Sequence, residues 1–160
     1  MTLLKYLVIV LLFAASTAWA GDVEDAVAAF DKKDYVTALK KYKSAVLKDD
    51  AVAQNNLGAM YYYGLGVVQD YAEAVRWYKL AAAQGYALAQ WLLGIKYDNG
   101  EGVVQNYARA HMWFNLAAVS GNANAVRQRN FVASKMTPQQ IVEAQKMARE
   151  CQARNFKNCD

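Results

Sequence analysis

The sequence predicts an all-α protein made of stacked helical hairpins, and three observations support this fold class. Residues 51–86 align without a gap on residues 87–122, with 19 of 36 positions identical. Apolar side chains within each copy recur at the spacing of a helix face. The composition, with 56% hydrophobic residues and one proline, excludes a disordered or collagen-like chain. Because a single hairpin cannot bury its apolar face, neighbouring copies must stack to create an interior.

The amino terminus has the pattern of a cleaved secretory signal. Lys5 provides a positive start, residues 6–15 form an apolar run, and residues 18–20 read Ala-Trp-Ala. The run is too short for a membrane span, which needs about 20 apolar residues. We therefore expect residues 1–20 to be a signal peptide, and the rest of the chain to be exported without stable membrane insertion.

Residues 21–160 are expected to form one repeat domain. The expected units are a partial repeat, two full repeats and a degenerate cap, at residues 22–50, 51–86, 87–122 and 123–155. Without Lys5 the formal net charge of +4 falls to +3, which is too small to indicate a nucleic-acid partner.

The first helix of each full repeat follows from an apolar stripe. In the first copy the stripe is Ala53, Leu57 and Tyr61, at positions i, i+4 and i+8. Gly58, and Gly94 one repeat later, fall inside this helix, where glycine costs about 1 kcal/mol relative to alanine. We expect close approach of the neighbouring helix to offset that cost.

The second helix of the first full repeat has recognisable ends. Asp70 is suited to cap it, and Glu73 three residues later completes the pattern of a capping box. Glycines in the preceding turn permit positive φ. Gly85 is placed to end the helix in the left-handed conformation. We therefore expect a helix from near Tyr71 to just before Gly85.

The end of the chain predicts a capping helix. Arg129 and Asn130 stand where the full repeats carry Leu and Gly, so the repeat pattern fades. Thr137, Pro138 and Gln140 then supply the cap, the first residue and the third residue of a new helix.

These spacings resemble the Sel-one-like repeat (SLR), a relative of the tetratricopeptide repeat. The first copy matches the pattern at Ala51, Ala53, Gln54, Leu57, Gly58, Tyr61, Gly64, Gly66, Val67, Asp70, Ala74, Trp77, Ala81, Ala82 and Gly85. The second copy matches it at Ala87, Ala89, Gln90, Leu93, Gly94, Tyr97, Gly100, Gly102, Val103, Ala110, Trp113, Ala117, Ala118 and Gly121. The resemblance implies a right-handed α-α superhelix of about three and a half repeats. Proteins of this family act mostly as adaptors that hold other proteins together.

Cys151 and Cys159 are eight residues apart, as are Ala81 and Ala89 in the repeat. The first alanine ends one helix and the second opens the next, so the two small side chains face each other across the turn. Cysteines placed likewise can bridge, and export favours a disulfide over free thiols. The spacing does not fit a redox Cys-x-x-Cys motif. The resemblance points the same way, because cysteine-rich exported relatives carry such a bridge in each repeat.

No constellation of residues indicates catalysis or metal binding. His111 is the only histidine and stands where the first copy has Val75, so a packed or surface histidine is favoured over a ligand. No serine lies in a nucleophile elbow. We expect no cofactor, no metal and no enzymatic activity.

The two copies differ along one stripe of the first helix, opposite the stripe that contains Leu57. In tetratricopeptide relatives this helix lines the concave surface. We therefore expect a protein or peptide partner to contact Asn55, Tyr62, Trp91, Ile95 and Asp98. Ordinary variation of solvent-facing residues is the alternative explanation.

The expected function is that of an exported, periplasmic or secreted adaptor that binds another protein. Two alternatives remain open. One is a cysteine-rich-type protein with penicillin-binding or weak β-lactamase activity, and the other is a secreted factor that acts on a host cell. Weak self-association through an uncapped end also remains open.

Overall fold

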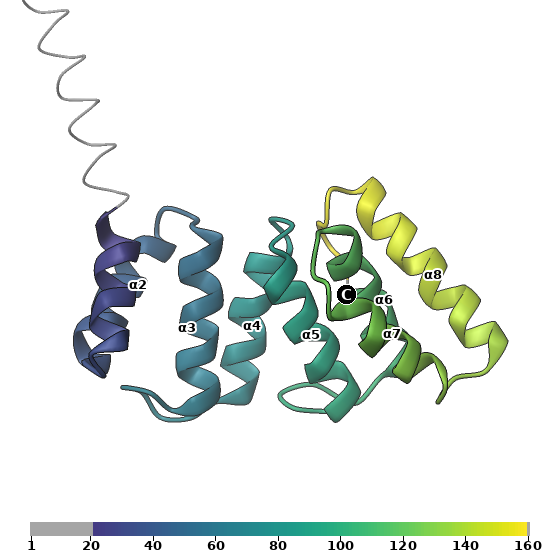
Figure 1. Cartoon of the computed structure of the whole chain (residues 1–160), viewed down its shortest axis with the longest axis horizontal. Helices are drawn as coiled ribbons and strands as arrows, with labels where there is room; N and C mark the ends of the chain where they lie inside the picture. The colour runs from purple at the N-terminus through teal and green to yellow at the C-terminus, as the bar shows by residue number, and fades with distance from the viewer. Residues whose placement is uncertain (1–20, 160) are drawn as a thin grey trace, which may run out of the picture.

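The computed structural model describes residues 21–159, which form helices and turns without any strand. Residues 21–31 are helical. The helices that follow are α2 Tyr35–Val46, α3 Ala51–Tyr63, α4 Tyr71–Ala82, α5 Ala87–Asn99, α6 Tyr107–Val119, α7 Ala125–Ala133 and α8 Pro138–Ala153. They stand in one row of hairpins, with α2 near one end and α8 at the other (Figure 1). The all-helical solenoid predicted from the repeat is confirmed, while the predicted signal peptide lies outside the described residues.

Side-chain caps fix where the helices begin. Asp70 caps α4 as predicted, because its carboxylate accepts a hydrogen bond of 2.9 Å from the Glu73 N–H. The Glu73 carboxylate pairs with Arg76 at 3.0 Å, so only half of the expected capping box forms. Thr137 and Gln140 form a complete box at the start of α8, with hydrogen bonds of 3.2 and 2.8 Å.

The end of α4 is a Schellman motif that reverses the chain. Gly85 has a φ of 80°, in the left-handed region that glycine adopts without strain. Its N–H donates to the Ala82 carbonyl at 2.9 Å, and the Tyr86 N–H donates to the Ala81 carbonyl at 3.2 Å. Gly121 repeats the motif after α6.

The two helices of a hairpin approach each other through glycine and an aromatic ring. A Cβ atom added at Gly58 would lie 2.8 Å from the Tyr78 ring, and one added at Gly94 would lie 2.5 Å from the Phe114 ring. Both rings are buried in the core. The expected close approach is therefore confirmed, and it explains why glycine occupies the middle of α3 and α5.

Cys151 and Cys159 form a disulfide, with a Cα–Cα distance of 5.1 Å. The Phe156 N–H donates to the Cys151 carbonyl at 3.0 Å, just as the Tyr86 N–H donates to the Ala81 carbonyl. Cys151 therefore occupies, at the end of α8, the place that Ala81 occupies at the end of α4.

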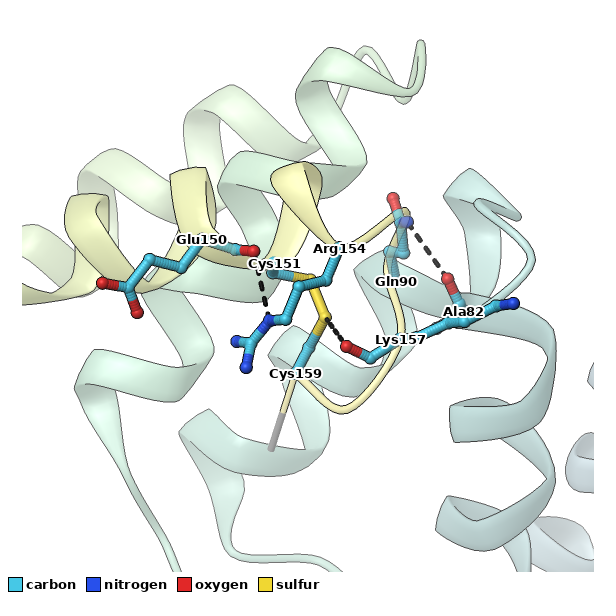
Figure 2. Close-up of a disulfide and its surroundings, with 7 residues drawn as sticks. All are labelled: Ala82, Gln90, Glu150, Cys151, Arg154, Lys157 and Cys159. Carbon is cyan, nitrogen blue, oxygen red and sulfur yellow. Dashed lines mark hydrogen bonds between the residues drawn. A yellow bond between two sulfur atoms is a disulfide. The ribbon is translucent and has the colours of Figure 1, made fainter.

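The disulfide holds the tail against the preceding repeat. Figure 2 shows the bridge between the end of α8 and the returning tail. The Phe156 ring covers the α4–α5 turn, because a Cβ added at Gly85 would lie 3.2 Å from it. A cavity of about 360 Å³ lies between the tail and α4, and its lining includes Leu80 of α4 and Trp113 of α6. The chain therefore folds back over α6 and α4.

We predict that Gly94→Ala destabilises the fold although alanine favours helix. The new methyl group meets the buried Phe114 ring, and such overpacking costs about 1–3 kcal/mol. Urea unfolding measures the change. The additional substitution Phe114→Leu makes room and should recover part of the loss. A Gly94→Ala variant as stable as the parent would contradict the close approach.

We predict that Cys151→Ala with Cys159→Ala lowers the free energy of unfolding by about 2 kcal/mol, the loop-closure contribution of a short loop. Alanine is the matched replacement because it occupies the equivalent places in the repeats. Helicity, followed by circular dichroism, should be unchanged. Reduction of the parent protein with dithiothreitol should cause the same loss, and equal stability before and after reduction would refute the role of the bridge.

Candidate protein-interaction surface

The five residues predicted to contact a partner lie on α3 and α5 at different depths. Asn55 is 3% exposed, and its Oδ1 atom is buried without a hydrogen-bond partner. Tyr62, Trp91, Ile95 and Asp98 are half-buried. Trp91 occupies the same place in α5 as Asn55 does in α3, and its Nε1 atom is also buried without a partner. The two equivalent positions thus each carry an unpaired polar atom.

Tyr62 lies at the junction between the two full repeats. Its hydroxyl donates to Glu101 at 3.0 Å, and Lys96 donates to the same carboxylate at 2.6 Å. The Lys96 ammonium lies 3.4 Å from the centre of the Tyr62 ring, within the range of a cation–π contact. A cation on α5 is thereby held between an aromatic ring of α3 and a carboxylate of the following loop.

Burial sets the protonation of this junction. It raises the pKa of Tyr62 to about 12, with a further contribution from the hydrogen bond to Glu101. Burial also lowers the pKa of Lys96, although the bond to Glu101 opposes the shift. Burial acts to raise the pKa of Glu101, but hydrogen bonds from Lys96 and Tyr62 outweigh it, so the pKa is lowered. The Tyr62 hydroxyl therefore keeps its proton at neutral pH and can donate to Glu101.

Asp98 takes part in a similar junction one repeat later. Its carboxylate accepts a hydrogen bond of 2.9 Å from Lys135, which follows α7. The Lys135 ammonium lies 4.4 Å from the centre of the Phe131 ring and 5.1 Å from that of Tyr107. Tyr62 and Asp98, which are equivalent positions, thus both contact the next unit rather than each other.

Lys96, Glu101 and Lys135 were not expected to contribute to this surface. A signal for two of them exists in the repeat alignment, because Lys96 and Glu101 replace Met60 and Leu65 of the first copy. When two apolar residues of one copy are replaced by opposite charges in the other, the two charged side chains are expected to form an ion pair. Comparing the variable positions in pairs would therefore have found this contact.

A small cavity of about 200 Å³ opens beside α3. Its lining residues come from the helix of residues 21–31, from α2 and from α3, and they are Val27, Phe30, Tyr42, Asn56 and Ala59. Ala59 belongs to the same variable stripe as Asn55 and Tyr62. One residue of the cavity lining therefore belongs to the stripe that is predicted to contact a partner.

His111 is 3% exposed on α6, as expected of a packed histidine. Burial, and secondarily the charge of Arg129, lowers its pKa, so the ring is neutral at pH 7. Among residues 21–159, no three His, Cys, Asp or Glu side chains gather as metal ligands would. In the same part of the chain, no helix combines the length and apolar character needed to cross a bilayer.

We predict that Glu101→Leu destabilises the protein by about 2 kcal/mol or more, because it leaves the buried Lys96 ammonium without its carboxylate. Lys96→Met with Glu101→Leu copies the pair found in the first repeat and should restore most of the stability. Chemical denaturation of Lys96→Met, Glu101→Leu and the double variant gives the coupling energy between the two side chains. Additive effects would show that the two side chains do not interact.

The comparisons with known proteins agree with this architecture. The model of the Sel1 repeat matches residues 51–86 and 87–122. The solved structure of c5321, "a protective antigen present in uropathogenic Escherichia coli strains displaying an SLR fold", is 26% identical with a TM-score of 0.82, and the match covers 91% of this chain and 32% of that chain. The Sel1 repeat protein from Oxalobacter formigenes is 30% identical with a TM-score of 0.67, and the match covers 71% and 46%.

This chain spans less than half the length of either solved relative. A search of curated proteins finds no match to it. This chain contains two Sel1 repeats, at residues 51–86 and 87–122.

Proposed function

We propose that this protein is an exported, non-catalytic adaptor that binds a segment of another protein along the exposed face of α3 and α5. One observation carries the proposal. The two full repeats share every glycine and most alanines, whereas a stripe of the first helix differs, with Asn55, Ala59 and Tyr62 replaced by Trp91, Ile95 and Asp98. Positions that the fold does not constrain are the ones free to specify a partner.

The placement of the five residues refines their proposed roles. Trp91 and Ile95 are half-buried beside the core and keep part of their apolar surface exposed, so they are the proposed anchors. Tyr62 and Asp98 already hold the junctions between units and lie at the margins of the surface. Asn55 lies beneath it. The contact is therefore centred on α5.

Two observations support export. A disulfide joins Cys151 and Cys159, and disulfides persist in oxidising compartments. The apolar run near the amino terminus fits a secretory signal. A role at the host surface is a second candidate, because one solved relative is a protective antigen of uropathogenic strains.

We predict that a photo-crosslinking amino acid at Ile95 captures a protein partner in the native envelope. The same reagent at Val142, an exposed position on α8, is the matched control and should capture nothing. Trp91→Ala should reduce the yield at position 95 about tenfold, because an aromatic anchor of an interface contributes about 1–3 kcal/mol.

Helicity and unfolding of Trp91→Ala are measured in parallel, so that loss of binding is separated from loss of fold. Equal capture at positions 95 and 142 would place the partner elsewhere and remove the proposal. Acylation by labelled penicillin would instead favour the penicillin-binding alternative.

A further inference from the structure

The first and second full repeats differ in how they fill the space in front of helices α3 and α5. In the second repeat Leu92 and Ile95 pack against the core. The equivalent residues of the first repeat are Asn56 and Ala59, and both line the open cavity of about 200 Å³. Two shorter or more polar side chains thus leave room that the next repeat fills.

Contacts within the protein hold the walls of this cavity in place. The Asn56 Nδ2 atom donates to the Tyr42 hydroxyl at 3.1 Å, and the Tyr42 ring is buried. The Phe30 ring packs edge-on against the Tyr35 ring, with centroids 5.4 Å apart. Val27 and Ala59 add apolar side chains to the lining. The volume accommodates one large aliphatic or aromatic side chain.

Two acidic residues lie one helical turn to either side of Val27, which lines the cavity. Glu24 and Asp31 flank Val27 on the helix of residues 21–31, at spacings of three and four residues that place all three on one face. Both acids are exposed, and within residues 21–159 neither takes part in an ion pair. Asp31 directly follows Phe30, which lines the cavity. Burial is the main cause of the raised pKa of Tyr42, another lining residue, and the charge of Asp31 adds to it.

We propose that this cavity receives one large apolar side chain of the partner segment, next to a Lys or Arg that faces Asp31. The inference rests on the proposed adaptor function, which it extends from α5 to the first repeat. An apolar anchor removes the cavity walls from water, and the neighbouring cation complements the unpaired acids. This end of the surface thus selects partner segments in which a Leu, Met or Phe lies next to a basic residue.

Selection from a random peptide library displayed on phage tests the proposal with the full chain as bait. Ala59→Ile is the counter-selection bait, because the second repeat carries Ile95 at this position within the same fold. Peptides that bind the parent but not Ala59→Ile should share an apolar residue adjacent to Lys or Arg. Their affinity for Ala59→Ile should fall at least about tenfold, the effect of losing one buried side chain.

The charge is tested separately. Asp31→Asn should weaken binding of the selected peptides about threefold at low salt, as expected for an exposed ion pair, and should reduce the salt dependence. Glu150→Gln, on the exposed surface of α8, is the matched control and should leave the affinity unchanged. Unfolding of each variant shows that the fold is intact, and Ala59→Val offers a smaller filling if Ala59→Ile is unstable.

A counter-selection that leaves no enriched peptide, or enriched peptides that share no basic residue, would overturn the inference. Dimerisation of the parent that Ala59→Ile abolishes would make a second copy the occupant and would also overturn it. Neither result touches crosslinking at Ile95, so failure of the cavity and failure of the adaptor function are distinguishable.

Discussion

The contact on which this structure depends is an aromatic ring pressed against a glycine of the partner helix. Tyr78 against Gly58 and Phe114 against Gly94 bring the two helices of each hairpin to a distance that no side chain at the glycine would allow. Dispersion between closely packed atoms grows steeply as the distance shortens. Glycine inside a helix loses more conformational entropy on folding than alanine does, and this packing offsets that cost.

Between one repeat and the next, polar contacts add to the shared apolar core. Lys96 is held between the Tyr62 ring and the Glu101 carboxylate, and Lys135 between the Asp98 carboxylate and two rings. Charged contacts of this type require directional partners, whereas apolar packing does not. The junctions therefore differ between copies, while the hairpins that they connect are alike.

Much of the fold could be predicted because each helix end depends on a few neighbouring residues. Asp70, Gly85 and the box of Thr137 with Gln140 act locally, and the 36-residue period transfers one hairpin to the next. The surface was harder to predict because its residues meet across repeats. Asn55, which its sequence position predicts at the contact surface, is buried, because a variable polar residue on a helix does not reveal what covers it.

The disulfide cross-links the turn that follows α8. Cys151 occupies the place of the buried Ala81 at the end of α4, and Cys159 follows it by eight residues, as the buried Ala89 follows Ala81. The backbone at those alanines already follows the same hydrogen-bonded turn. The disulfide thus adds a covalent bond to a turn that the inner units close with backbone hydrogen bonds and buried alanines.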